Sequence, residues 1–236
     1  MHTLTWLDST SLTFPPGTLA MTEPPGLLAA GGDLSPRRLE AAYAAGIFPW
    51  FDDASPILWW CPDPRAVIRP AQVHVGRTLR RRLKRRDYKV TMDMDFDAVI
   101  AACAAPRTYA DGTWITSDML EAYRRLHARG TAHSVEVWID GNLVGGLYGV
   151  ALGRCFFGES MFARATDASK IAFVHLLGQL DAWDFPLVDC QMPNPHLDRL
   201  GVEQMARRDF LTEVADLVQR DGVPGPWVMD WRYAGS

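Results

Sequence analysis

The amino-acid sequence predicts an α+β fold, and two observations lead to that class. After residue 130 the chain shows three strand-like runs, one helix-like run and a final short strand, so the strands are grouped rather than alternating with helices. The length of 236 residues is enough for a large core and predicts one large domain, or a main domain with a small one. Hydrophobic residues make up 48% and charged residues 22%, as in an ordinary globular protein.

Composition excludes several classes of protein. No run of 18 apolar residues is present, so a membrane-spanning helix is not expected. The first ten residues lack the basic and apolar regions of a secretory signal. The four cysteines form no C-x-x-C pair, which favours reduced thiols and a cytoplasmic location. The net charge of −4 argues against a protein coated in nucleic acid.

The first 65 residues combine turns with aromatic rings. Residues 14–36 are rich in Pro and Gly and are expected to be loop, ending where Ser35 caps a short helix that has Pro36 at its first position. Gly46 is expected to end this helix. Aromatic residues then crowd residues 47–60. They indicate either a loop packed onto the core or a platform for a flat ligand such as a base, and the sequence leaves both open.

A basic stretch stands out in the middle of the chain. It follows a predicted strand at 71–75 and carries seven basic residues and no acid between Arg77 and Arg86. Leu79 and Leu83 give it the apolar side of a short helix. Because uncompensated like charges repel one another, the stretch is either a solvated face or a binding surface for an anion. A strand at 88–92 and a helix at 95–104 follow, and Thr116 or Ser117 caps a helix that ends at Gly130.

The second half brings polar residues to the ends of two strands. Residues 133–139 alternate as a half-buried strand, the Asp140-Gly141 turn leads to a return strand at 143–152, and a third strand covers 155–161. A helix then runs from the cap Asp167 to Pro186, before a strand at 187–191. Strands joined by a crossover helix lie parallel, so Glu159, Asp189 and Gln191 are expected to open into one crevice. Asn194-Pro-His196 is expected to be a turn, followed by a final helix at 208–219 and a tail whose Trp227 and Trp231 pack on the body.

Several common sites are absent from the sequence. Gly158-Glu-Ser-Met-Phe162 lacks the second glycine of a nucleophile elbow, so Ser160 is a poor nucleophile candidate. His127 and His133 have no spacing that suits zinc. The chain has neither a Walker phosphate loop nor the Gly-rich turn that would hold the pyrophosphate of coenzyme A.

Seven motifs together resemble the bacterial leucyl/phenylalanyl-tRNA–protein transferases, in the order of that family and over nearly the whole chain. One departure is Cys61, where the family usually carries Ser. The motifs are Gly26-Leu-Leu-Ala-Ala-Gly-Gly-Asp-Leu-Ser-Pro36, Gly46-Ile-Phe-Pro-Trp-Phe51, Leu58-Trp-Trp-Cys-Pro-Asp-Pro-Arg65, Gly112-Thr-Trp-Ile-Thr116, Ala132-His-Ser-Val-Glu-Val-Trp138, Gly158-Glu-Ser-Met-Phe162 and Asp189-Cys-Gln191.

The resemblance implies a small N-terminal α/β domain (1–64) and a larger domain (65–236) similar to the GCN5-related acetyltransferases. It implies transfer of Leu or Phe, and Met less well, from aminoacyl-tRNA to proteins that begin with Arg or Lys, which marks them for degradation. No cofactor and no metal are implied. We expect a cytoplasmic monomer without a membrane partner.

The resemblance also implies site residues, carried over position by position. Trp50 and Trp114 resemble the rings around the 3′-terminal adenosine, with Tyr123 nearby. Phe156, Met161 and Leu147 resemble the walls of the amino-acid pocket, although the family more often has Met where Leu147 stands. Glu159, Asp189 and Gln191 resemble the acceptor-binding and catalytic group.

Chemistry suggests a role for each polar residue. We expect Asp189 to orient the Gln191 side-chain amide, whose oxygen accepts a hydrogen bond from the attacking amine. Glu159 is expected to bind the cationic side chain of the acceptor. The basic stretch would bind tRNA phosphates without sequence preference, through Arg77, Arg80, Arg81, Lys84 and Arg85.

Three other functions remain open at this point. An acyl-coenzyme-A N-acetyltransferase shares the expected fold, but the pyrophosphate turn is missing. A non-catalytic RNA-binding module explains the basic stretch and the Trp-rich loops, but not the three polar residues gathered in one crevice. A ligase that builds peptidoglycan bridges from aminoacyl-tRNA would differ in its acceptor.

Overall fold

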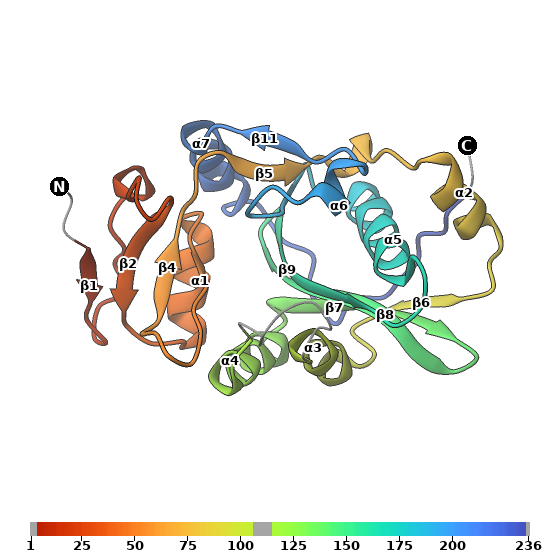
Figure 1. The fold of residues 1–236 in the computed structure, drawn as a ribbon, viewed down its shortest axis with the longest axis horizontal. Coiled ribbons are helices and arrows are strands. Elements are labelled where there is room, and N and C mark those ends of the chain that lie inside the picture. The colour runs from red at the N-terminus through yellow and green to blue at the C-terminus, as the bar shows by residue number, and fades with distance from the viewer. Residues whose placement is uncertain (1–3, 106–114, 235–236) are drawn as a thin grey trace.

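Two β-sheets form the framework of the protein (Figure 1). The computed structural model describes residues 4–105 and 115–234. The smaller sheet has the order β1-β2-β4-β3 and the larger one β11-β5-β10-β9-β8-β7-β6. Helices α3 and α4 lie on one side of the larger sheet and α5 on the other (Figure 1). The predicted α+β class is confirmed.

The smaller sheet is built from the first 60 residues. Its helix α1 begins as predicted, because the Ser35 hydroxyl accepts a hydrogen bond from the Arg38 N–H at 3.4 Å and Pro36 takes the first position. The expectation of loop over all of 14–36 is wrong at β2. This strand lies between β1 and β4 and is largely buried, so it lacks the alternation that marks a strand in sequence. The elements are β1 (Thr5–Leu7), η1 (Gly17–Leu19), β2 (Leu27–Gly31), α1 (Pro36–Ala44), β3 (Phe48–Pro49) and β4 (Leu58–Trp60).

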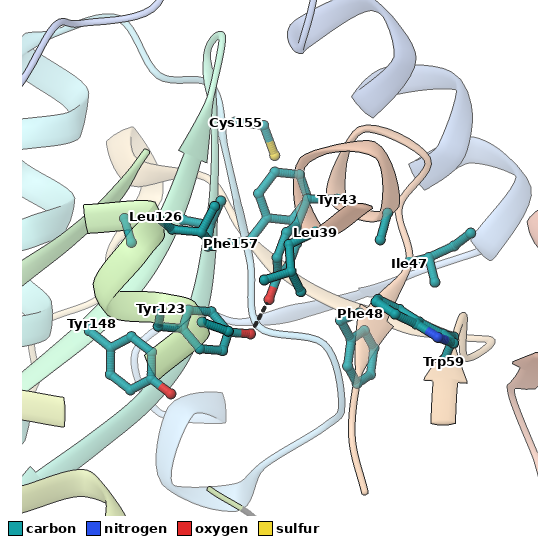
Figure 2. Packing of buried hydrophobic residues seen from close by; sticks show 14 of the residues in the cluster. Leu39, Tyr43, Ile47, Phe48, Trp59, Tyr123, Leu126, Tyr148, Cys155 and Phe157 are labelled. Carbon is teal, nitrogen blue, oxygen red and sulfur yellow. Dashed lines mark hydrogen bonds between the residues drawn. The ribbon is translucent and has the colours of Figure 1, made fainter. Parts of the chain in front are cut away.

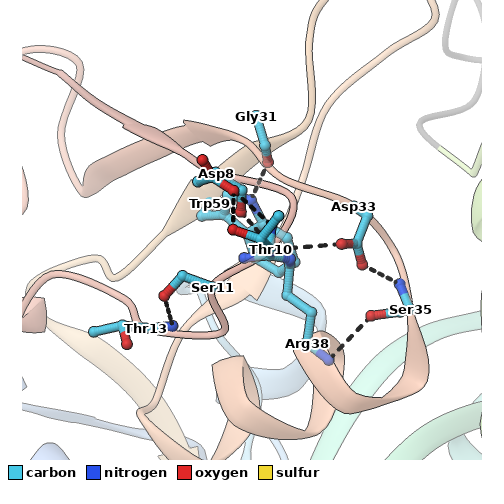
Figure 3. Close-up of polar contacts among 9 residues, drawn as sticks. All are labelled: Asp8, Thr10, Ser11, Thr13, Gly31, Asp33, Ser35, Arg38 and Trp59. Atoms are coloured by element: carbon cyan, nitrogen blue, oxygen red, sulfur yellow. Dashed lines mark hydrogen bonds and ion pairs between the residues drawn. The ribbon is translucent and has the colours of Figure 1, made fainter.

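A buried arginine holds this part of the chain together (Figure 3). The Nη2 atom of Arg38 donates to the Asp8 carbonyl at 2.7 Å and to the Asp33 carboxylate at 3.3 Å. Trp59 donates from its indole nitrogen to the Gly31 carbonyl at 2.9 Å. These contacts fix α1 against the sheet, and with it the helix face that carries Tyr43.

The larger sheet contains the predicted strand-helix-strand unit. β9 and β10 pair in parallel, with Leu187 opposite Cys155. All other neighbouring strands of the larger sheet pair antiparallel. β7 is more buried than the half-buried strand we expected, because helices cover both faces of the sheet. The strands are β5 (Arg65–Ile68), β6 (Lys89–Met92), β7 (Ala132–Ile139), β8 (Asn142–Leu152), β9 (Cys155–Ala163), β10 (Leu187–Asp189) and β11 (Glu203–Met205).

Most predicted helices are present. Thr116 caps α4 by accepting a hydrogen bond from the Met119 N–H at 3.3 Å. Asp167 precedes α5 but makes no side-chain capping bond, since its φ is +63°. None of the helices in the described residues is long and apolar enough to span a bilayer. The helices are η2 (Pro70–Gln72), α2 (Arg77–Lys84), α3 (Phe96–Ala104), α4 (Ser117–Ala128), α5 (Ala168–Ala182), α6 (Pro195–Asp198) and α7 (Arg207–Leu217).

Three local predictions are wrong. The strand expected at 71–75 lies earlier, at β5, because Pro70 starts a 3₁₀ turn and cannot donate to a ladder. The strand expected to reach Gln191 ends at Asp189, because Gln191 has a φ of +56°. The turn expected at 194–196 continues into α6.

Two apolar cores flank the larger sheet. One joins the smaller sheet to α3 and α4, and its rings include Tyr43 and Phe157, with centroids 5.2 Å apart (Figure 2). The other contains α2, α5 and the C-terminal tail. As predicted, Trp227 of the tail is buried, and its ring stacks on His133 at 3.6 Å. The proposed domain border after residue 64 falls between the two sheets, but the first core crosses it.

Candidate active site

A cavity of about 340 Å³ opens between the two sheets. Strands β8 and β9, helix α5, the chain after β10 and the β3 segment of the smaller sheet all contribute to it. It is lined by Phe48, Pro49, Trp50, Leu147, Tyr148, Phe156, Gly158, Glu159, Ser160, Met161, Phe173, Leu176, Cys190, Gln191, Met192, Pro193, Asn194 and Leu197.

One part of the cavity is apolar. Leu147 and Phe156 are buried and Met161 is half-buried, and all three line the cavity; these are the residues for which the family resemblance implied an amino-acid pocket. Phe173 and Leu176 of α5 complete this wall and were not predicted. No sequence pattern singled them out, because α5 is buried almost all round. Such a wall suits a nonpolar side chain.

Glu159 is the central polar group (Figure 2 shows its two tyrosine partners). Tyr43 donates to its Oε1 and Tyr123 donates to its Oε2, each at 2.7 Å. The two tyrosine hydroxyl oxygens are themselves 2.5 Å apart. Burial raises the pKa of Glu159 to about 8, although both tyrosine hydrogen bonds act to lower it. The carboxyl group is therefore mostly neutral at pH 7.

The two tyrosines come from different parts of the chain. Tyr123 on α4 is fully buried behind Glu159 and does not line the cavity, so its expected place beside an adenosine stays a prediction. Tyr43 on α1 was not predicted as a site residue, since its spacing marks only the apolar face of a helix. Both hydroxyls fix the orientation of the carboxyl group.

We had expected Asp189 to orient the Gln191 side chain, but in the structure it contacts Gln191 only through the backbone. Its carboxylate is fully buried and accepts two hydrogen bonds from Arg65, at 2.8 and 2.6 Å. It also accepts one from the backbone N–H of Gln191, at 2.9 Å. The two residues are not on one strand face, because the strand ends between them. Arg65, which the sequence did not single out, is therefore part of the arrangement.

The side-chain amide of Gln191 turns back toward β9. Its Nε2 donates to the Gly158 carbonyl and lies 3.4 Å from Glu159 Oε1. No hydrogen bond between described residues uses the amide oxygen. Glu159 and Gln191 thus meet at the cavity as the sequence predicted, while Asp189 lies beneath it.

The cavity rim carries an exposed indole. Trp50 is 38% exposed, and its ring lies 5.5 Å from that of Trp60. The other indole expected beside the adenosine, Trp114, lies outside the described residues.

The basic residues lie on a separate surface. In α2 and just after it, Arg77, Arg80, Arg81, Lys84 and Arg85 are all exposed. Arg85 pairs with Asp87 at 2.9 Å, and Arg82 pairs with the same carboxylate. The apolar side of α2 packs against α5, which also lines the cavity. In the described part of the chain, no three His, Cys, Asp or Glu side chains gather as a metal site would require.

Comparison with known proteins gives this site its context. The family model described as leucyl/phenylalanyl-tRNA protein transferase matches residues 67–215, and its N-terminal domain model matches residues 32–63. A leucyl/phenylalanyl-tRNA–protein transferase of Pseudomonas fluorescens is 59% identical over 95% of this chain and 99% of its own length. That of Stutzerimonas stutzeri is 56% identical over 97% and 99%.

Likeness to solved structures is much weaker. A ribosomal-protein-alanine N-acetyltransferase from Brucella melitensis is 15% identical, covering 59% of this chain and 94% of its own, with a TM-score of 0.34.

The sequence matches define an enzyme of the aminoacyltransferase class. The chain belongs to the leucyl/phenylalanyl-tRNA–protein transferase family. This membership excludes the non-catalytic RNA-binding module considered above.

Proposed function

We propose that the chain moves Leu or Phe, and Met less well, from aminoacyl-tRNA to the α-amino group of proteins that begin with Arg or Lys. The product is marked for degradation, and the enzyme works as a cytoplasmic monomer. The observation that carries this proposal is that one cavity is lined both by an apolar wall and by Glu159 and Gln191. Family membership supports the donor and the reaction class.

The apolar wall supports a donor that carries a large nonpolar side chain. Leu and Phe share little except apolar bulk, so one site for both must be hydrophobic and tolerant of shape. Differences of one methylene in such a pocket change binding by only about 1–3 kcal/mol. Met161 has an unbranched, flexible side chain and Leu147 is branched only at Cγ, and both suit a pocket that tolerates different shapes.

The reaction needs little chemical assistance. The neutral amine nitrogen attacks the ester carbonyl, a C–N bond forms, and the bond to the ribose oxygen breaks; the amine loses one proton and the leaving ribose oxygen gains one. An α-amino group has a pKa near 8, so roughly a tenth is neutral at pH 7. Holding amine and ester together can contribute about 7–11 kcal/mol, and one positioned polar group adds about 10²–10⁴-fold.

Two polar groups have matching roles. The Gln191 amide oxygen, which no described side chain engages, would accept a hydrogen bond from the attacking amine. Glu159 would bind the Arg or Lys side chain of the acceptor. An approaching cation favours the ionised carboxylate, so binding would release the proton that Glu159 holds at neutral pH.

The remaining contacts would be with tRNA. Trp50 is exposed at the rim and can stack on the terminal adenine, and Trp114 is proposed as its partner. The exposed basic side of α2 would bind phosphates of the tRNA body, including through Arg77 and Lys84.

Transfer of labelled Leu from charged tRNA tests the proposal. The acceptors are two peptides that differ only in their first residue, Arg or Ala. We expect label on the Arg peptide alone. Equal labelling of both would refute the acceptor preference, and labelling of neither, with acetyl transfer from acetyl-coenzyme A instead, would refute the reaction.

A further inference from the structure

Gln191 lies in a backbone conformation that side-chain-bearing residues seldom adopt. Its φ is +56°, and the Met192 N–H donates to the Cys190 carbonyl at 2.8 Å, across Gln191. A hydrogen bond from residue i+2 to residue i around a positive φ is the γ-turn of the rare, strained kind. Strain of this kind persists only where the surroundings hold it, and it gathers at functional sites.

The peptide groups around Gln191 are tied to the neighbouring strand. The Ala66 N–H donates to the Gln191 carbonyl at 3.1 Å, and the Cys190 N–H donates to the Ala66 carbonyl at 2.9 Å. On its other side, the Gln191 N–H donates to Asp189 Oδ1 at 2.9 Å. The pairing of β10 with β9 ends at Asp189, and the Gln191 N–H bonds to the Asp189 carboxylate instead of to a strand carbonyl.

Arg65 fixes that carboxylate. Its Nε donates to the same oxygen, Oδ1, at 2.8 Å, and its Nη2 donates to Oδ2 at 2.6 Å. The guanidinium is fully buried between the rings of Phe48 and Phe210, 4.9 and 4.4 Å from their centroids. A buried ion pair gives little net stability compared with apolar residues of similar size, so stability alone does not account for this one.

We propose that Arg65 is a positioning residue of the transfer reaction, acting through Asp189 on Gln191. By holding Oδ1 under the Gln191 N–H, Arg65 keeps the γ-turn in place and so aims the side-chain amide at Gly158 and Glu159. This inference rests on the proposed function and on the role given there to Gln191. It assigns Arg65 and Asp189 no contact with substrate.

A double-mutant cycle tests the inference. Arg65→Met is combined with Asp189→Leu, because removing both charges avoids leaving a buried unpaired ion that could unfold the chain. This pair of changes is made in the wild type and in Gln191→Ala. We expect kcat to fall about 10- to 100-fold in the wild type, with each KM within about threefold, since misplacement of a catalytic group costs rate rather than affinity.

In the Gln191→Ala background the same pair of changes should lower kcat less than about twofold, because the side-chain amide that Arg65 and Asp189 position is already absent. Arg69→Met is the matched control: Arg69 also makes two hydrogen bonds to one carboxylate, that of Glu213, at 2.9 and 3.0 Å, but in the described residues that carboxylate makes no hydrogen bond to Gln191. Melting temperatures of all variants show whether the fold is kept.

The outcomes separate this inference from the proposed function. If the losses multiply in an active enzyme, the Arg65–Asp189 pair acts independently of Gln191, and the inference is overturned while the proposed function stands. Unchanged kcat in the pair variant would also overturn it. A wild-type chain without transfer activity would overturn the proposed function and the inference with it.

Discussion

The cavity and the basic surface of α2 are held in opposite ways. In the cavity, Glu159 and Gln191 have hydrogen-bond partners that fix their position, and Asp189 beneath them is fully buried. On α2 and just after it the basic side chains other than Arg82 are exposed, and Asp87 is the acid that Arg82 and Arg85 share. One region offers defined geometry, and the other offers a field of positive charge.

That difference predicts two kinds of behaviour. Changing one fixed group should damage the chemistry steeply and without regard to salt, because the group is lost from a single geometry. Changing exposed charges should weaken binding in small, roughly equal steps that salt screens. The four experiments below test this contrast, from the largest expected effect to the smallest.

Gln191→Ala should lower kcat about 100-fold or more at saturating substrates, because the positioned amide is lost. Steady-state kinetics with charged tRNA and an Arg peptide measures this. Gln204→Ala, an exposed position on β11, is the control and should leave kcat unchanged. A full transfer rate in Gln191→Ala would show that the cavity does not depend on this geometry.

Replacing Arg80, Arg81 and Arg85 by Gln should raise KM for charged tRNA about tenfold or more at moderate salt. The plot of log affinity against log salt should become less steep, its negative slope shrinking in magnitude by roughly 2–3, because three phosphate contacts are lost. A minimal aminoacyl-adenosine donor should be nearly unaffected.

The control for this variant removes three other exposed arginines, Arg124, Arg125 and Arg129, at and just after the end of α4. It changes net charge equally and should leave the salt slope unchanged. Equal damage to both donors by the α2 variant would refute a phosphate-binding role.

Acceptor binding should strengthen as pH rises from about 6.5 to about 8.5. Glu159 has a pKa of about 8 in the free enzyme, so the ionised form that attracts a cation is the minor one at pH 7 and becomes the major one above 8. The dissociation constant of an Arg peptide, measured by calorimetry without donor, should fall up to about tenfold between pH 7 and pH 8.5. Glu159→Gln should remove the dependence; a pH-independent constant in the wild type would contradict the role.

Met161→Ala should change donor choice only a few-fold, because a wider apolar wall alters the fit of Leu and Phe by about 1 kcal/mol. Competition between the two charged tRNAs, read as the product ratio, measures the shift. Met94→Ala, at a methionine 66% exposed on the surface, is the control. An unchanged ratio would show that Met161 does not contact the donor side chain.

Local signals predicted much of the fold. Ser35 and Pro36 marked the start of α1, and the order of strands around α5 gave the parallel pair β9 and β10 correctly. The buried strands β2 and β5 were missed. Neither shows the alternation of a half-buried strand, and each lies beside prolines that indicate loop.

The candidate site was predicted in its components but not in its connections. The meeting of Glu159 and Gln191 follows from the parallel pairing of β9 and β10, because each residue lies two positions past the last paired residues, Phe157 and Asp189. The partner that fixes Asp189, Arg65, lies 124 residues away in sequence, and Tyr43 is separated from Glu159 by 116. No local sequence pattern predicts contacts between residues so far apart in the chain. The γ-turn at Gln191 also carries no signal, because Gln is not a residue that favours positive φ.

The hydrogen bond from Tyr43 has a consequence for how the enzyme can be divided. Tyr43, Phe48 and Trp50 come from the first 64 residues, whereas the carboxyl group that Tyr43 orients comes from β9. The proposed reaction centre thus contains residues from both sides of the proposed domain border. A shortened chain beginning at residue 65 would keep Glu159 and Gln191 but lose part of the cavity wall and the Tyr43 hydrogen bond, so we expect neither half to be a catalyst by itself.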